Sequence, residues 1–233
     1  YWSMKMNQMF EIYNNYADLY DELVNHEDYN NNLRTFLNDN IVWKNKSVYE
    51  FGVGTGRVTK NYIDKVARAV LCDNSEHMIG KAKTNLAFAN DKINYLCIDH
   101  KDIGKIIEKL DIVIEGWSFG HLIVNEKNDK DLWIRKIIDE SIRLANDKII
   151  IIETLGTNVN KPIPPGEVLP YFYEKLELYG FKKNIIETDY KFHDYKEASR
   201  IMGAFFGENM KNNILDNKYS VIKEYTGIWI LEI

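Results

Sequence analysis

Apolar positions along this chain recur in two periods, one typical of helices and the other typical of strands. From about Met9 to Val24 they recur at helical spacing and include several tyrosines. A second helix is predicted from Asp28 to Leu37, ending near a cluster of Asn and Asp residues. Because both helices precede the first strand, we expect them to be additions to a sheet that cover its ligand-binding edge.

The segments that follow alternate between short apolar runs and longer helical patterns. The predicted strands are Val48 to Phe51, Ala69 to Cys72, Ile93 to Ile98, Ile112 to Ile114 and Ile149 to Ile152. The predicted helices between them are Val58 to Val66, a helix capped by Asn74 or Ser75 that continues through Leu86, and Asp129 to Ala145. Such alternation implies parallel strands joined by right-handed crossovers, with the fifth run as a central strand covered on both faces.

The pattern changes after the fifth strand. Pro162, Pro164 and Pro165 predict a stiff, irregular loop. Gly180 is well placed to end the helix that follows this loop. The predicted elements of this part are a helix from Val168 to Tyr179, a strand from Lys183 to Phe192, a short helix from Ala198 to Phe206 and a last strand from Ile228 to Ile233.

Length and charge narrow the class of protein. The 233 residues suffice for one substantial core, and we expect a single domain over 1–233, with 1–45 as a helical cap segment and 46–233 as the core. A formal net charge of -5 offers no basic field to nucleic acid or to an anionic membrane. Neither a membrane-spanning run nor a signal pattern is found, and Cys72 and Cys97 fit buried free thiols, so we expect a cytoplasmic protein.

A glycine turn follows the first predicted strand and is the most informative segment. Gly52, Gly54 and Gly56 alternate, and Glu50 lies two positions before the first of them. The dinucleotide fingerprint would need a glycine where Arg57 stands, and the phosphate loop would need a following Gly-Lys-Ser or Gly-Lys-Thr. A carboxylate at this strand end would repel a pyrophosphate by about 4 kcal/mol at roughly 4 Å. The turn therefore favours a ligand that carries positive charge and no phosphate.

In these segments the chain resembles the class I S-adenosylmethionine-dependent methyltransferases. The matching segments are Glu50 to Gly56, Leu71 to Ser75 with Met78, Asp99 to Asp102, and Ile112 to Trp117. The resemblance implies a doubly wound α/β fold with a Rossmann-like core and an N-terminal helical cap. Its mostly parallel sheet of seven strands would have the order 3-2-1-4-5-7-6, with the last strand antiparallel.

The resemblance also implies a binding site for S-adenosylmethionine, with S-adenosylhomocysteine as product. The glycine turn would lie beside the methionine part, Asp73 would grip the ribose hydroxyls, and Asp99 with its neighbour would meet the adenine. In similar enzymes a tyrosine of the leading helix closes over the cofactor, and we favour Tyr16 over Tyr13 and Tyr20. The cofactor-binding residues implied are Tyr16, Glu50, Gly52, Gly54, Gly56, Asp73, Asn74, Met78, Asp99, His100 and Glu115.

On the acceptor side the sequence offers candidates and no recognisable catalytic cluster. His121 follows the fourth strand and could act as a general base, although a loop histidine is more often ordinary polar surface. Trp117 and Phe119, with His121, could bind substrate, and packing explains both aromatic residues equally well. No Cys/His spacing predicts a metal site.

The predicted reaction is methyl transfer from the sulfonium to an unidentified acceptor. Sequence signatures for DNA-base methylation are absent and the chain is acidic, so a small molecule is the first choice of acceptor. Protein methylation, a non-catalytic S-adenosylmethionine-binding protein and a dinucleotide oxidoreductase are the alternatives. The acceptor atom and the oligomeric state stay open.

Overall fold

The isoleucines Ile149 to Ile152 lie at the centre of the molecule in strand β5 (Ala145–Thr157) of a computed structural model, which describes residues 17–233. All four side chains are fully buried. Successive side chains of a strand point to opposite faces, so Ile149 and Ile151 enter the apolar cluster on one face of the sheet while Ile150 and Ile152 enter the cluster on the other. The prediction of a central strand covered on both faces is confirmed.

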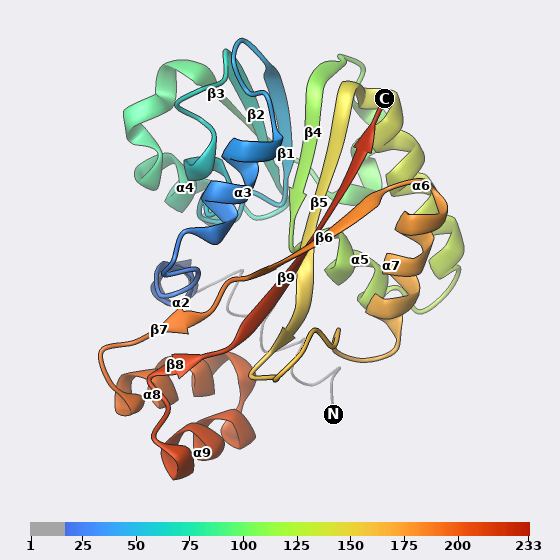
Figure 1. Ribbon diagram of the computed structural model, residues 1–233. Coiled ribbons are helices and arrows are strands. Elements are labelled where there is room, and N and C mark those ends of the chain that lie inside the picture. Colours follow the sequence, from blue (N-terminus) through green and yellow to red (C-terminus); the bar gives the residue numbers. More distant parts are fainter. Residues whose placement is uncertain (1–16) are drawn as a thin grey trace.

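The sheet around β5 has seven strands and is mostly parallel (Figure 1). In spatial order they are β3 (Ile93–Cys97), β2 (Arg68–Asp73), β1 (Ser47–Phe51), β4 (Leu110–Gly116), β5, β9 (Glu224–Glu232) and β6 (Lys182–Glu187). Strand β9 runs antiparallel to both β5 and β6. Since β9 is the last strand of this sheet along the chain, the order 3-2-1-4-5-7-6 with an antiparallel last strand is confirmed.

Helices cover both faces of the sheet, as a doubly wound fold requires (Figure 1). One face packs against α3 (Asn32–Asn40) and α4 (Glu76–Asn85), and the other against α5 (Phe119–Asn125), α6 (Lys130–Leu144) and α7 (Val168–Leu178). Short 3-10 turns connect several elements, namely η1 (Thr59–Asn61), η2 (Ala87–Lys92) and η3 (His100–Lys105). Ser75 accepts a hydrogen bond from the backbone N–H of Met78 and caps α4, which decides between the two predicted caps.

A smaller unit lies at the edge of the sheet where the parallel strands end (Figure 1). It consists of α2 (Ala17–Asn25), β7 (Tyr190–Lys191), α8 (Tyr195–Phe206), α9 (Glu208–Asn217) and β8 (Val221–Ile222). These elements share a third apolar cluster to which α2 contributes Leu23. Lys81 of α4 pairs with Asp18 at 2.7 Å and ties α2 to the main sheet. The carboxyl edge of the sheet is therefore covered by this unit.

The predicted helix from Val58 to Val66 is wrong. The structure has only the 3-10 turn η1 and further turns there. Backbone N–H groups of Asn61, Tyr62 and Lys65 donate to carbonyls three residues back, which is the tighter 3-10 pattern. The side chains of Thr59 and Tyr62 both donate to the Glu50 carboxylate, at 2.8 and 2.5 Å, and hold the segment against the first strand in this conformation.

The predicted strand from Lys183 to Phe192 is two strands, β6 and β7, in different sheets. Thr188 and Asp189 break it because their side chains turn inward. The Thr188 hydroxyl lies 2.7 Å from that of Thr226, and an Asp189 oxygen accepts from the Glu224 N–H at 3.0 Å. This break sends the chain from the large sheet into the smaller unit.

Other boundaries also differ from the predicted ones. The first predicted helix begins outside the described residues, and its described part is α2. The second begins at Asn32 because the Asp28 carboxylate accepts the N–H groups of Asn32 and Leu33 at 2.8 and 2.9 Å. Helices α5 and α9 were not predicted. No helix within residues 17–233 is long and apolar enough to span a membrane.

Candidate functional site

The glycine turn joins β1 to the segment beside α4. The N–H groups of Gly52 and Val53 donate to the Cys72 carbonyl at 2.8 and 3.0 Å, so the turn folds over the end of β2. Gly52 has a φ of +72°, and a Cβ placed there would overlap the Ser118 side chain. Gly54 has a φ of +53° and faces the Tyr20 ring, 3.5 Å from where its Cβ would lie. The two glycines therefore supply a left-handed backbone, and the missing side chain of Gly52 lets Ser118 pack directly against the turn.

We expect Gly52→Ala to lower the free energy of unfolding by about 2 kcal/mol or more, because the left-handed conformation and the overlap with Ser118 both oppose a methyl group. Gly80→Ala is the matched control, since Gly80 lies inside α4 with nothing within 4 Å of its Cβ position. That change should be neutral or stabilise by up to about 1 kcal/mol. Urea unfolding of both variants measures the difference, and equal effects would contradict it.

Asp73 ends β2 directly under this turn. One carboxylate oxygen accepts the Gly54 N–H at 2.9 Å, and the other accepts the Ser75 N–H at 2.9 Å. Burial raises the pKa of Asp73, while these backbone hydrogen bonds favour the charged form and oppose that shift. Asp73 thus links the turn to the start of α4 and keeps lone pairs free to accept further donors.

A cavity of about 290 Å³ opens above the turn and the ends of β2 and β4. Its wall brings together seven of the predicted cofactor-binding residues, namely Gly52, Gly54, Asp73, Asn74, Met78, Asp99 and His100. The Asp99 side chain accepts the Lys101 N–H at 2.8 Å and starts η3, which carries His100. Burial lowers the pKa of His100 to about 4, so its ring is neutral near pH 7. Its Nδ1 has no hydrogen-bond partner among the described residues.

Glu50, Gly56 and Glu115 do not line this cavity. Glu50 is 1% exposed and lies behind the turn, where it accepts hydrogen bonds from Thr59 and Tyr62. Burial raises the pKa of Glu50 to about 7. The Glu50 carboxylate was predicted to act on the charge of the ligand, but it does not face the cavity. Its hydrogen bonds with Thr59 and Tyr62 instead hold the segment after the turn against β1. Tyr16 lies outside the described residues.

Glu115 and Glu153 form a buried pair at the ends of β4 and β5. Burial raises the pKa of both carboxyl groups, and they share a hydrogen bond, so the pair holds a proton. Glu115 accepts the Phe119 N–H at 2.9 Å, and Glu153 accepts the Gly120 N–H at 2.6 Å. Together they fix the first turn of α5, and through it the position of His121.

Phe119 is not a substrate contact in this structure. It is fully buried between the rings of Phe51 and His100, with ring centroids 6.1 and 5.1 Å away, and it lines neither large cavity. The reason is the start of α5, which turns this side chain toward the sheet. The packing explanation considered for Phe119 holds.

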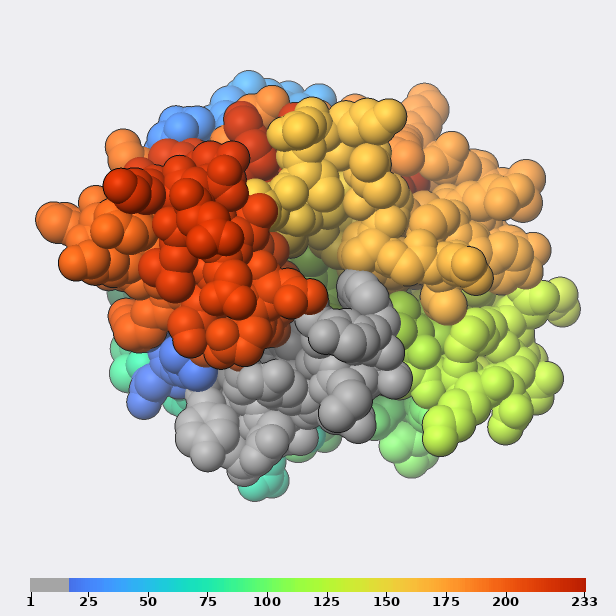
Figure 2. Space-filling view, turned by 90° about the horizontal axis from the view of Figure 1, so that it is seen from below, coloured from blue at the N-terminus to red at the C-terminus, as the bar shows by residue number. Residues whose placement is uncertain are grey.

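A second cavity of about 420 Å³ adjoins the first, under α2, α8 and α9. Figure 2 views the side on which the parallel strands end and shows the surface hollowed between the α8–α9 pair, in red, and the loop after β5, in yellow. The lining is largely apolar, and it includes three buried carboxyl groups, those of Glu27, Glu153 and Glu224. Arg57 is the single Lys or Arg among the described residues that line it.

The two cavities share three lining residues, Tyr20, Trp117 and His121. Trp117 has a φ of +53°, and the Arg57 guanidinium lies 3.4 Å from the centroid of its ring. Burial lowers the pKa of His121 to about 4, so this side chain is neutral near pH 7. The predicted acceptor residues Trp117 and His121 are thus at the junction of the cavities.

Sequence reasoning missed Arg57, Glu27 and Glu224 as site residues. Arg57 and Glu27 form a buried ion pair, and the Arg57 guanidinium also hydrogen bonds to Tyr20. Arg57 was considered only as the residue that breaks the dinucleotide pattern. A signal was present, because an arginine placed directly after a glycine turn is a cation at a ligand-facing strand end. Residues 17–233 place no three His, Cys, Asp or Glu side chains together as metal ligands.

Comparison with known proteins finds a match in the part of the chain that carries most of the first cavity's lining. A family model described as a methyltransferase domain matches residues 48–137, which run from β1 into α6. No curated protein matches this chain in sequence.

Solved structures resemble the fold over most of the chain. A candidate RNA methyltransferase from Pyrococcus horikoshii is 14% identical, with 87% of this chain and 82% of that chain covered and a TM-score of 0.54. A SAM-dependent methyltransferase from Aquifex aeolicus is 14% identical, with 87% and 90% covered and a TM-score of 0.55. The (4+2)-cyclase SpnF is 13% identical, with 85% and 79% covered and a TM-score of 0.54. At these identities the likeness is one of fold.

Proposed function

We propose, from the class I S-adenosylmethionine-dependent methyltransferase fold that this chain has, that it binds S-adenosylmethionine in the cavity of about 290 Å³ and methylates a small molecule in the cavity of about 420 Å³. The observation that carries the proposal is the junction of the two cavities at Tyr20, Trp117 and His121. An in-line displacement needs its two reactants held close and aligned, and adjoining cavities with shared walls meet that need.

The residues of the first cavity fit this cofactor. Gly52 and Gly54 line the cavity without a side chain, and a Cβ on Gly52 would overlap Ser118. The Asp73 carboxylate can accept hydrogen bonds from a diol, and the unpaired Nδ1 of His100 can bond to a heterocycle. When bound, the cofactor supplies a methyl group on a positively charged sulfur. The absence of any lysine or arginine contact to Asp73 fits a ligand without phosphate, within the part of the chain that is described.

The chain's own residues would position and desolvate the reactants. The Glu115–Glu153 pair holds α5, so that His121 and Trp117 stand at the junction. A neutral His121 can accept a hydrogen bond or a proton from the acceptor, although its low pKa makes it a weak base. Proximity would then supply most of the rate, which agrees with the lack of a recognisable catalytic cluster.

A small-molecule acceptor is favoured by the second cavity. It is lined largely by apolar side chains and carries three carboxyl groups against one guanidinium, which disfavours a polyanion. The Pyrococcus protein is named for RNA, and nothing in this lining supports that substrate here. A protein side chain that reaches into the cavity is the alternative within methyl transfer.

The proposal is tested first by binding. Calorimetry should show adenosylhomocysteine binding in the micromolar range or tighter, with NAD binding much more weakly. Tight NAD binding without adenosylhomocysteine binding would instead indicate a dinucleotide enzyme.

Turnover is the second test. Methyl-labelled cofactor incubated with the protein and a metabolite extract should yield labelled small products, and a parallel incubation with cell protein should yield none. Binding without transfer to either pool would favour a non-catalytic protein or another chemistry, as the cyclase with this fold illustrates.

A further inference from the structure

We infer that the acceptor of this enzyme is an amine with an apolar body, and that Glu224 binds its ammonium group. The inference rests on the proposed function and names the substrate class of the larger cavity. It is carried by a buried carboxyl oxygen that has no hydrogen-bond partner among residues 17–233.

Glu224 is the first residue of β9 and lines the larger cavity. The residue is 2% exposed. Its Oε1 accepts the Thr154 hydroxyl at 2.9 Å, whereas its Oε2 has no hydrogen-bond partner among residues 17–233. Buried polar atoms are nearly always paired, because leaving one unpaired costs the desolvation of that atom. An unpaired acceptor in a cavity wall therefore indicates a donor on the ligand.

The other charged groups in this wall are already engaged. Glu153 accepts the Gly120 N–H and shares a proton with Glu115. Glu27 is paired with Arg57, whose guanidinium also stacks on Trp117. Glu27 Oε2 also lacks a hydrogen bond, but Arg57 already pairs with that carboxyl group. Glu224 is thus the lining carboxyl group, within the described residues, that has an unpaired oxygen and neither an ion pair nor a shared proton.

The surroundings of Glu224 favour a cationic donor over a neutral one. Burial raises its pKa to about 7, while the nearby Thr157 and Thr154 side chains and the charge of Arg57 favour the ionised form. A positive charge directly beside it would therefore restore the carboxylate. Charge-assisted hydrogen bonds are about twice as strong as neutral ones. The rest of the lining, including Leu23, Val124, Leu169 and Phe205, suits an apolar body.

The test compares probes that differ in one group. Primary amines from butylamine to octylamine, with 2-phenylethylamine, are titrated by calorimetry beside the alcohols and carboxylates of the same carbon skeletons, with and without saturating adenosylhomocysteine. At least one amine should bind about 10-fold more tightly than its alcohol, and its carboxylate should not bind measurably. If every amine binds no better than its alcohol, the inference is wrong.

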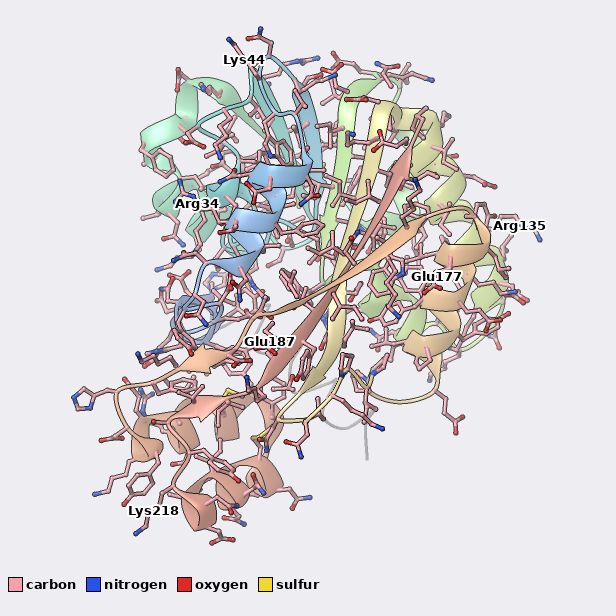
Figure 3. The ribbon with its side chains drawn as sticks, in the orientation of Figure 1. Arg34, Lys44, Arg135, Glu177, Glu187 and Lys218 are labelled. Atoms are coloured by element: carbon pink, nitrogen blue, oxygen red, sulfur yellow. The ribbon has the colours of Figure 1, made fainter. Side chains whose placement is uncertain are left out.

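Variants locate the contact. Glu224→Gln should weaken the best amine about 10-fold or more and change its alcohol less than about twofold, and Glu224→Asp should lie between wild type and Glu224→Gln. Glu177→Gln is the matched control, because Glu177 lies on the outer side of α7 (Figure 3) and should change neither affinity. Equal losses for amine and alcohol would overturn the role of Glu224.

The affinity for adenosylhomocysteine is measured on each variant to show that the variant is folded. The same measurement tells failure of the proposed function apart from failure of this inference. Loss of cofactor binding in the wild-type protein would remove the proposed function. Normal cofactor binding without a preference for amines would remove only this inference.

Discussion

Asp73→Asn is expected to weaken the binding of S-adenosylmethionine and adenosylhomocysteine by about 10- to 100-fold, which corresponds to about 1.5–3 kcal/mol for a hydrogen bond to a charged group. Asp73 already accepts the N–H groups of Gly54 and Ser75 through its two oxygens. An amide at this position replaces one acceptor by a donor, so it both loses the charge offered to a ribose diol and repels one of these N–H groups. The measurement is calorimetry with adenosylhomocysteine.

Asp102→Asn is the matched control for this variant. Asp102 is in the same kind of strand-end loop, in η3, but it does not line the first cavity and pairs with Lys105 at 2.9 Å on the surface. Its affinity for adenosylhomocysteine should be unchanged. If Asp73→Asn binds as tightly as the control while remaining folded, Asp73 does not hold the cofactor.

The parallel part of the sheet could be predicted because each of β1 to β5 contains a short apolar run with a clear end. The isoleucines of β5 and the aspartate that ends β2 mark an interior strand and a ligand edge without reference to the rest of the chain. The resemblance to class I methyltransferases supplied the strand order, and the observed sheet confirms that order. The segment Val58 to Val66 failed because its conformation depends on the distant partner Glu50.

The first cavity could be predicted better than the second for the same reason. Its wall is built from strand ends that follow one another in the sequence, so motif spacing was enough to bring Asp73 and Asp99 together. The second cavity is lined by α2, the end of β5, α8 and α9, which are far apart along the chain. Glu27 and Glu224 meet there only through the tertiary fold, and no local pattern distinguishes them from surface glutamates.

Phe119 and Glu50 show the limit of assigning roles by position alone. Glu50 was predicted to act on the ligand from the end of the first strand, and Phe119 was offered as a substrate contact with packing as an equal alternative. Both side chains are buried in the protein. Glu50 lies in β1, whose side chains alternate between the two faces of the sheet, and Phe119 lies in the first turn of α5, which turns it toward the sheet. The motif identifies the site, whereas the direction of each side chain follows from packing.

At pH 9, where Glu27 is ionised in the wild type, Arg57→Met should lower the free energy of unfolding by about 3 kcal/mol, because breaking a buried ion pair leaves the partner carboxylate without its cation. Arg57 is paired with Glu27, stacks on Trp117 at 3.4 Å and hydrogen bonds to Tyr20, so methionine replaces its volume and none of these contacts. Because Tyr20 and Trp117 line both cavities, the acceptor affinity should fall as well. Urea unfolding measures the first effect.

The loss in Arg57→Met should grow with pH, and this separates the ion pair from simple packing. Burial raises the pKa of Glu27 to about 8 even though Arg57 pulls it down. A carboxyl whose folded pKa exceeds its unfolded value near 4.5 stabilises the folded state less as pH rises toward the folded pKa, and levels off above it. Without Arg57 the folded pKa is higher still, so the variant continues to lose stability beyond pH 8.

We therefore expect the difference between wild type and Arg57→Met to be larger at pH 9 than at pH 6 by about 1 kcal/mol or more. At pH 6 both folded proteins keep the Glu27 proton, and only the lost stacking and hydrogen bonding remain. The double variant Glu27→Gln with Arg57→Met removes the titrating group, so its stability relative to Glu27→Gln should not change with pH in this range. A pH-independent loss in Arg57→Met would show that the arginine acts through packing on Trp117 and not through the charge of Glu27.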